Sequence, residues 1–254
     1  MIISPLAQRF MPAANSEPRR NGRAVDMLLL HYTGMASAEA ACDLLCKSDS
    51  GVSCHYLVDE DGTITQMVGE EMRAWHAGVS SWKGETDTNS RSIGIEIQNP
   101  GHNLGYRGFP DVQMAAVIAL CRDILSRHAI PPAHVLAHSD VAPGRKIDPG
   151  ERFDWARLHE EGIGHWVPPP AADATPLTAG ELSAYQSMLR DYGYGIEATG
   201  ACDPCTLAVT DAFRRHFQPA LTGCPPDRSA LEGVKRLVRG IVLSRAAGEE
   251  GPPA

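Results

Sequence analysis

The chain has 254 residues, a formal net charge of −8 and a hydrophobic content of 43%, a composition typical of a globular protein that excludes disorder throughout. Proteins that bind DNA or RNA usually carry a basic face, so nucleic acid is not an expected partner. No apolar run approaches the roughly 20 residues that cross a bilayer, so no transmembrane segment is expected, and the oligomeric state stays open.

Residues 1–23 are predicted to form an irregular arm. Four arginines interrupt this region and it has no sustained apolar segment, which is not the pattern of a secretory signal. The seven cysteines are an odd number, and without a signal they are expected to be reduced thiols. We therefore predict a cytoplasmic protein, with a periplasmic protein, or one exported without a cleavable signal peptide, as the alternative.

Residues 24–167 are predicted to form an α/β domain with a mixed central sheet flanked by helices. Short apolar runs predict strands at 27–30 and 135–137, and a hairpin is predicted over 55–68. In residues 92–98 the isoleucines alternate with Gly94 and Glu96, so this strand turns Glu96 away from the core. Helices are predicted over 36–47 and, with the clearest apolar stripe, over 111–128.

The second half of the chain is predicted to hold a smaller unit. Residues 168–176 form a proline-rich linker to a small domain at 177–243, where the apolar pattern predicts three helices. Asp203 and Pro204 mark the start of the second helix. A domain of this size can bury only a thin core of its own. Residues 244–254 are predicted to be a flexible tail.

Two histidines come at the ends of separate apolar strands, and a carboxylate follows the second of them. His31 ends the first strand, His138 ends the last, and Asp148 lies ten residues after His138. Two imidazoles and a carboxylate suit zinc, and three protein ligands leave a fourth position open for water, as in catalytic sites. Taken singly, a histidine at a strand end is more often a hydrogen-bonded polar residue, and an aspartate before proline is common in turns.

Two more residues could supply chemistry beside such a metal. Lys146 lies two residues before Asp148, so in an extended segment both side chains point to the same side, and its ammonium could stabilise an oxyanion. Glu96 could accept a proton from metal-bound water and pass it to a leaving amine. Together these groups would hydrolyse an amide bond. Taken alone, Glu96 also suits a buried ion pair, and Lys146 a solvated loop.

Five motifs occur in order, at residues 29–33 (LLHYT), 53–58 (SCHYLV), 73–78 (RAWHAG), 92–97 (SIGIEI) and 138–150 (HSDVAPGRKIDPG). They resemble the zinc-dependent N-acetylmuramoyl-L-alanine amidases of the AmpD-like, or amidase-2, family, which share a fold with peptidoglycan recognition proteins. The small domain resembles, more weakly, the three-helix peptidoglycan-binding module that often follows such amidases.

The resemblance implies roles for the residues that match its motifs. His31, His138 and Asp148 would be the ligands of Zn²⁺, Glu96 the catalytic carboxylate, and Lys146 the lysine that stabilises the transition state. The implied reaction is hydrolysis of the amide bond between N-acetylmuramic acid, or its 1,6-anhydro form, and the L-alanine of the stem peptide, in peptidoglycan recycling or remodelling. A non-catalytic peptidoglycan-binding protein on the same fold and a zinc peptidase are the alternatives.

Four residues are candidates for substrate contact. Trp75 and His76 lie in a motif that lines the groove of similar enzymes, although an aromatic packed on the sheet beside a hydrogen-bonded neighbour explains them equally well. Tyr56 could border the site, but packing in the core is the preferred interpretation. Asn99 could bond a sugar or a peptide, and it also suits a simple turn before Pro100.

Overall fold

The computed structural model describes residues 3–249, with side chains described as far as Gly240. Its centre is a six-stranded sheet in the order β1 (Arg9–Phe10), β5 (Ile64–Gln66), β4 (Tyr56–Val58), β7 (Ser92–Ile97), β3 (Met27–Tyr32) and β8 (Val135–Ala137). β5 runs antiparallel to β4, whereas β4, β7, β3 and β8 pair in parallel. The predicted mixed sheet with flanking helices is confirmed.

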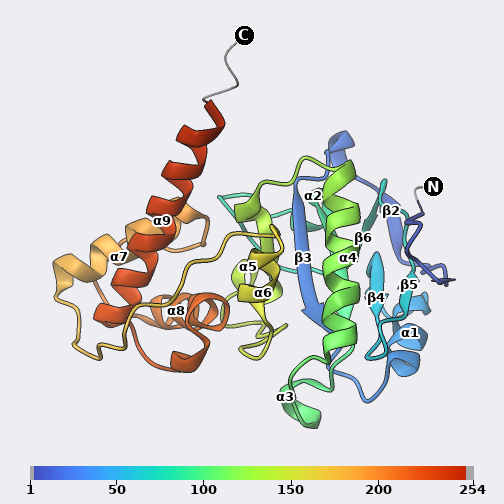
Figure 1. Ribbon diagram of the computed structural model, residues 1–254, viewed down its shortest axis with the longest axis horizontal. Helices are drawn as coiled ribbons and strands as arrows, with labels where there is room; N and C mark the ends of the chain where they lie inside the picture. Colours follow the sequence, from blue (N-terminus) through green and yellow to red (C-terminus); the bar gives the residue numbers. More distant parts are fainter. Residues whose placement is uncertain (1–2, 250–254) are drawn as a thin grey trace.

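The long helix α4 (Asp111–Arg127) covers one face of this sheet (Figure 1). It brings Val117, Cys121 and Ile124 against the alternating isoleucines of β7, which all face this side, and against Leu28 and Leu30 of β3. The apolar residues that repeat every 3.6 positions in the helix therefore pack against those that alternate in the strands, and together they form one buried layer.

Two different groups of helices cover the opposite face. Helix α1 (Ala38–Cys46), capped by Ser37, packs Ala41 and Leu45 against Leu57 of β4. Beside β3 and β8 lie the C-terminal helices α7 (Ala179–Tyr192), α8 (Pro204–Phe217) and α9 (Arg228–Glu249), grouped to one side of the sheet in Figure 1. Neither group covers the carboxyl ends of β3 and β7, where a pocket lies against the sheet.

The core of the C-terminal helices is continuous with the first domain. Their apolar residues belong to one buried cluster with residues of the first domain, and we call this set the shared cluster; its members include Met27, Leu29, Ala77, Trp82, Leu136, Val141, Tyr185, Leu189, Tyr192, Tyr194, Phe213 and Phe217. The core expected for the small domain is therefore joined to the first domain rather than separate from it. The apolar residues on the second face of β3 and β8 need cover, and the C-terminal helices supply it.

Trp82 joins the two parts of the chain. Its ring is fully buried, with centroids 5.7 Å from Tyr192 and 5.0 Å from Tyr194, both edge-on. The backbone N–H of Lys83 donates to the carbonyl of Gly193 at 2.8 Å. Gly193 has a φ of 150°, and a Cβ atom there would overlap the Trp82 ring, so this close approach requires glycine.

The structure refines two sequence expectations at the ends of the chain. The described part of the arm is mostly irregular, as predicted, but it contributes two short strands: β1 pairs with β5, and β2 (Ser16–Pro18) pairs with β6 (Met72–Ala74). These strands are only two or three residues long and are held by backbone hydrogen bonds, so they leave no side-chain pattern. At the other end, α9 continues past residue 243 to Glu249, and residues 250–254 lie outside the described residues.

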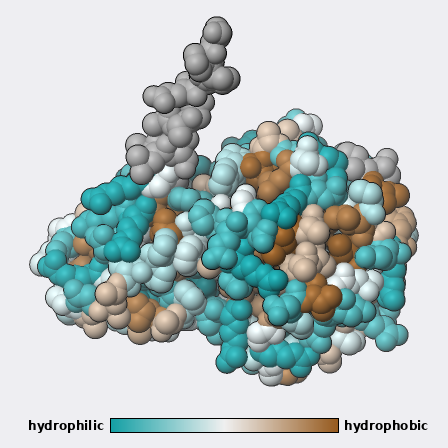
Figure 2. All heavy atoms as spheres, viewed as in Figure 1, coloured by the Kyte–Doolittle hydropathy of each residue, from teal (hydrophilic) through white to brown (hydrophobic). Residues whose placement is uncertain are grey.

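The remaining helices are single turns or little more, namely α2 (Thr88–Arg91), α3 (Gly101–Leu104), α5 (His138–Val141), α6 (Trp155–Glu160) and the 3-10 turns Arg20–Gly22, Pro132–His134 and Pro219–Leu221. In the described part of the chain, none of the helices has the length and hydrophobicity that a membrane span requires. Hydrophilic residues cover most of the face shown in Figure 2.

Candidate metal centre and active site

Three predicted ligands converge at the edge of the pocket. His31 lies in β3, His138 begins α5 directly after β8, and Asp148 follows in the loop. Because β3 and β8 are neighbours in the sheet, the two imidazoles meet with their Nδ1 atoms 2.9 Å apart. Oδ2 of Asp148 lies 3.2 Å from Nδ1 of His31 and 3.0 Å from Nδ1 of His138. All three side chains are buried.

This triangle has the size of a metal site. Zinc bonds of about 2.0–2.1 Å in a tetrahedron place ligand atoms roughly 3.3 Å apart, close to the separations found here. Burial, together with His138, lowers the pKa of His31 to about 4. Burial raises the pKa of Asp148, but the two histidines outweigh it and hold the pKa well below its usual value. Neutral imidazole and ionised carboxylate are the forms that bind metal.

Hydrogen bonds behind the two histidines select which ring nitrogen faces the triangle. His138 uses Nε2 to donate to the carbonyl of Ala77 at 3.0 Å. Nε2 of His31 lies 3.0 Å from Nδ1 of His76, Nε2 of His76 lies 3.3 Å from the Ser92 hydroxyl, and that hydroxyl donates to the carbonyl of Thr88 at 2.7 Å. Read as a series of donors ending at a carbonyl, these contacts put the His31 proton on Nε2 and leave the Nδ1 lone pair free for a metal.

Glu96 faces the same space from the neighbouring strand. In the sheet it pairs with His31 on one side and with Leu57 on the other, so its side chain leaves the sheet on the same face as His31. Its Oε2 atom is buried and has no hydrogen-bond partner among the described residues. Burial raises the pKa of Glu96 well above its usual value, as does the nearby Asp148, whereas Lys146 acts in the opposite direction.

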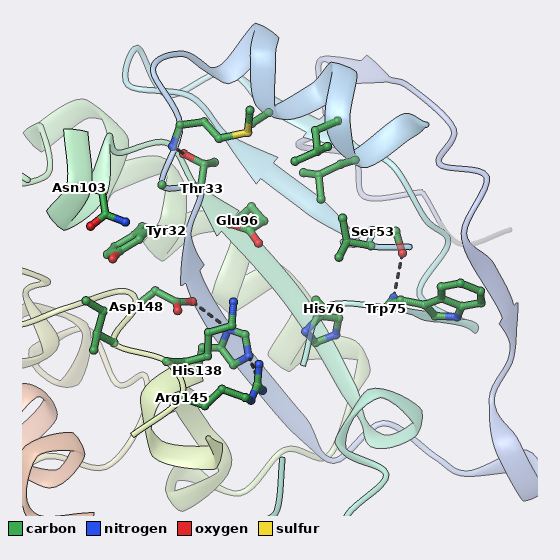
Figure 3. A pocket seen from close by; sticks show the side chains of 18 residues that line it. Tyr32, Thr33, Ser53, Trp75, His76, Glu96, Asn103, His138, Arg145 and Asp148 are labelled. Carbon is green, nitrogen blue, oxygen red and sulfur yellow. Dashed lines mark hydrogen bonds and ion pairs between the residues drawn. The ribbon is translucent and has the colours of Figure 1, made fainter. Parts of the chain in front are cut away.

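The pocket has a volume of about 490 Å³. In Figure 3, His138 and Asp148 lie on one side of it and Ser53 and Trp75 on the other, with Glu96 and His76 between them. The lining also includes Lys146, which is exposed to solvent, and the side chains of Tyr32, Met35, Leu44, Leu45, Val52, Asn103 and Arg145. The site therefore has an apolar wall from α1 and a polar wall from the loop at 138–148.

The four candidates for substrate contact lie in different environments. Trp75 lines the pocket and is held through its backbone N–H, which donates to the Ser53 hydroxyl at 2.8 Å. His76 reaches the lining but is buried against His31. The structure does not bring Tyr56 or Asn99 to this pocket. Tyr56 lies on the α4 face and donates to Glu70 at 2.5 Å, and Asn99 donates to the carbonyl of Arg107 at 2.9 Å.

Sequence analysis missed several residues at the pocket. Tyr32 and Arg145 each stand next to a predicted site residue and lie within the motifs at 29–33 and 138–150, which could have pointed to them. Asn103 lies in α3, and its sequence has no motif that points to the site. Among the described residues, His31, His138 and Asp148 are the one group of three or more histidine, cysteine or acidic side chains that could hold an ion.

Comparisons with known proteins show which family the chain resembles. The sequence profile of the N-acetylmuramoyl-L-alanine amidases matches residues 21–151. AmiD of Escherichia coli K12 is 35% identical over 228 residues, which are 81% of this chain and 80% of that protein. AmpD of the same organism is 42% identical over 107 residues, or 42% of this chain and 56% of AmpD.

Solved structures extend the likeness to the C-terminal helices. The structure of E. coli AmiD with the substrate anhydro-N-acetylmuramic acid-L-Ala-D-gamma-Glu-L-Lys has a TM-score of 0.75 and 32% identity, and covers 88% of this chain and 92% of that one. AmpDH3 of Pseudomonas aeruginosa has a TM-score of 0.73 and 30% identity, and covers 88% of this chain and 95% of that one.

Proposed function

The chain belongs to the N-acetylmuramoyl-L-alanine amidase family, and on this premise we propose that it is a zinc enzyme whose metal is held by His31, His138 and Asp148. As a member it hydrolyses the amide bond between N-acetylmuramic acid and the L-alanine of the stem peptide. The observation that carries the proposal is the buried triangle of Nδ1, Nδ1 and Oδ2, with the outward nitrogen of each imidazole occupied by a hydrogen bond.

The donor set also fits the metal by its chemistry. A zinc ion there supplies Lewis-acid chemistry, which acidifies water and polarises a carbonyl oxygen. Two neutral imidazoles and one carboxylate are three ligands, the number found in catalytic rather than structural zinc sites. Ala77 and His76 orient the imidazoles from behind, as outer hydrogen bonds do at such centres.

Glu96 is the proton carrier in this proposal. Its buried Oε2 has no hydrogen-bond partner among the described residues, and its raised pKa makes the ionised carboxylate a stronger proton acceptor. The carboxylate takes a proton from the attacking water as the new carbon–oxygen bond forms, and delivers it to the nitrogen of L-alanine as the carbon–nitrogen bond breaks. The ammonium of Lys146 stabilises the negative charge on the former carbonyl oxygen. The products are a free lactyl carboxyl group and a free amine.

The substrate we propose is a soluble muropeptide with a 1,6-anhydro sugar. Two structures similar to this chain over both parts, those of E. coli AmiD and P. aeruginosa AmpDH3, were solved with anhydro-muramyl peptides. Trp75 supplies a flat apolar surface at one side of the pocket, suited to the face of a sugar. Digestion of purified anhydro-muropeptide and of intact sacculi, with products identified by mass, tests this preference.

We propose the cytoplasm as the compartment, where the enzyme would recycle wall fragments. All seven cysteines are free, and three of them, Cys202, Cys205 and Cys224, are exposed. Exposed thiols persist in a reducing compartment and tend to oxidise outside it. Cell fractionation with detection of the chain tests this, and recovery outside the inner membrane would favour the periplasmic alternative.

The roles of Glu96 and His138 are separable by experiment. We expect Glu96→Ala to retain zinc and lose turnover by about 100-fold or more, since general acid–base catalysis contributes about 10²–10⁴-fold. We expect His138→Ala to lose zinc, which mass spectrometry of the native protein measures directly. Full activity in Glu96→Ala would refute the proton-carrier role, and full zinc content in His138→Ala would refute the metal site.

A further inference from the structure

Helix α8 of the C-terminal part lies along the loop that carries two of the three metal ligands. It contacts this loop near its start, its middle and its end. His216 contacts Asp140, a Cβ atom added at Gly144 would lie 3.1 Å from Cβ of Ala208, and Arg215 donates to Glu151. The segment from His138 to Glu151 is thus backed by a helix more than fifty residues further along the chain.

Asp140 is the central contact, two residues after His138. Its carboxylate is fully buried and accepts three hydrogen bonds. One comes from the backbone N–H of Ala137 at 2.8 Å, which holds the turn directly before His138. The other two cross from the C-terminal part, from the Tyr194 hydroxyl at 2.6 Å and from Nδ1 of His216 at 2.7 Å.

The two donors from the C-terminal part are themselves fixed. The His216 ring is stacked between Trp155 and Phe217, with ring centroids 3.7 Å and 4.0 Å away. Tyr194 is 1% exposed and packs edge-on against Trp82. Because both donors are packed in place, a shift of the loop would break their hydrogen bonds to Asp140. Leaving a buried acceptor without a partner costs free energy, so these contacts oppose such a shift.

We propose that Tyr194 and His216 are positioning residues for the metal centre, acting through Asp140 on His138. The C-terminal part then supports the loop that carries His138, as well as covering the sheet. This inference rests on the proposed zinc site, since it concerns the geometry of a zinc ligand. It predicts that loosening the contact weakens zinc binding while all three ligands remain in place.

The sharpest test is a pair of matched variants. Tyr194→Phe removes only the hydroxyl that reaches Asp140 across the interface. Tyr185→Phe removes an equally buried hydroxyl in the same cluster, whose 3.2 Å hydrogen bond goes to Thr210 within the C-terminal part. We expect Tyr194→Phe to weaken zinc binding by roughly 3- to 10-fold. Loss of a hydrogen bond made directly to a metal ligand typically weakens metal binding by about 10- to 100-fold, and Tyr194 acts one step further away. Tyr185→Phe should change zinc affinity less than 2-fold.

Zinc affinity is measured by competition with a chromophoric chelator on the full-length protein, beside thermal unfolding of each variant. With zinc in excess, Tyr194→Phe should recover the activity of the unaltered protein. His216→Phe keeps the stacked ring but removes the donor, and should shift zinc affinity in the same direction.

Two results overturn the inference. One is unchanged zinc affinity in Tyr194→Phe, and the other is an equal loss in Tyr185→Phe, which would mean a general loosening of the fold. If the unaltered protein takes up no zinc, the proposed function itself fails, so the two failures are distinguishable.

Discussion

His76 tests the reasoning about the metal centre most directly, because its effect on zinc affinity can be worked out from the structure. In the zinc-bound state Nδ1 of His31 must be free of its proton, so the proton sits on Nε2 and donates to Nδ1 of His76. In His76→Phe this acceptor is gone, and His31 is only 1% exposed, so water cannot replace it. Without metal, His31 escapes the penalty by placing its proton on Nδ1, facing Asp148.

The cost therefore falls on zinc binding. An unsatisfied buried donor costs about 1–3 kcal/mol, which corresponds to a roughly 5- to 150-fold weaker zinc complex. Gly94→Ala should act in the same direction, because a Cβ atom at Gly94 would lie 2.6 Å from Cγ of His76 and displace the ring. Ser92→Ala, which removes only the acceptor behind His76, should lose less.

Competition with a chromophoric chelator, at fixed pH, gives the zinc dissociation constants of these variants. The reasoning is refuted if His76→Phe binds zinc within 2-fold of the unaltered protein. A variant that binds zinc tightly but turns over slowly would instead indicate that His76 contacts substrate, as the sequence motif allowed.

Three further outcomes are expected. Burial, together with Arg19, lowers the pKa of His55 to about 3. As pH falls from about 6.5 toward 3, His55 is therefore protonated in the unfolded chain but stays neutral in the folded chain. The free energy of unfolding of the metal-free protein falls by about 1.4 kcal/mol per pH unit because of this histidine. Denaturant titrations at several pH values should show a shallower loss in His55→Gln; an identical slope would contradict the assignment. Zinc at 100 times its dissociation constant should raise the free energy of unfolding by about 2.7 kcal/mol. The melting temperature should then be about 5–10 °C higher than that of a chelator-treated sample. Equal melting temperatures in the two samples would argue against the metal site. Gly193→Ala should destabilise by about 1–3 kcal/mol because of Trp82, whereas Gly180→Ala in the open part of α7 should be neutral or stabilising; chemical denaturation measures both, and a tolerated Gly193→Ala would show that the contact yields.

Much of the larger domain was predictable because its signals are local. The apolar run at β3, the alternation in β7 and the stripe of α4 each specify an element and its buried face, and the elements found match those expected. The same alternation turns Glu96 away from the isoleucines. The resemblance to the amidase family implied that His31, His138 and Asp148 bind one metal ion. In the structure they meet because strands β3 and β8 are neighbours in the sheet.

What the sequence concealed depends on partners distant along the chain. Met27, Leu29 and Leu136 show that a second face is apolar, but not that the C-terminal helices cover it. Tyr56 and Asn99 carry groups suited to a substrate, yet their neighbours Glu70 and Arg107 occupy those groups inside the protein. The place of His76 behind His31 was hidden for the same reason, since only the folded sheet brings the two rings within 3.0 Å.

The shared cluster also limits how freely nature or an engineer can recombine the two parts. A proline-rich stretch such as 168–176 invites cutting and grafting, as between independent modules. Here the cut would expose Met27, Leu29, Leu136 and Trp82 on one fragment and the facing tyrosines on the other. A foreign three-helix module grafted after residue 167 would have to reproduce that complementary surface, so an exchange that respects the linker alone would yield an aggregation-prone chimera.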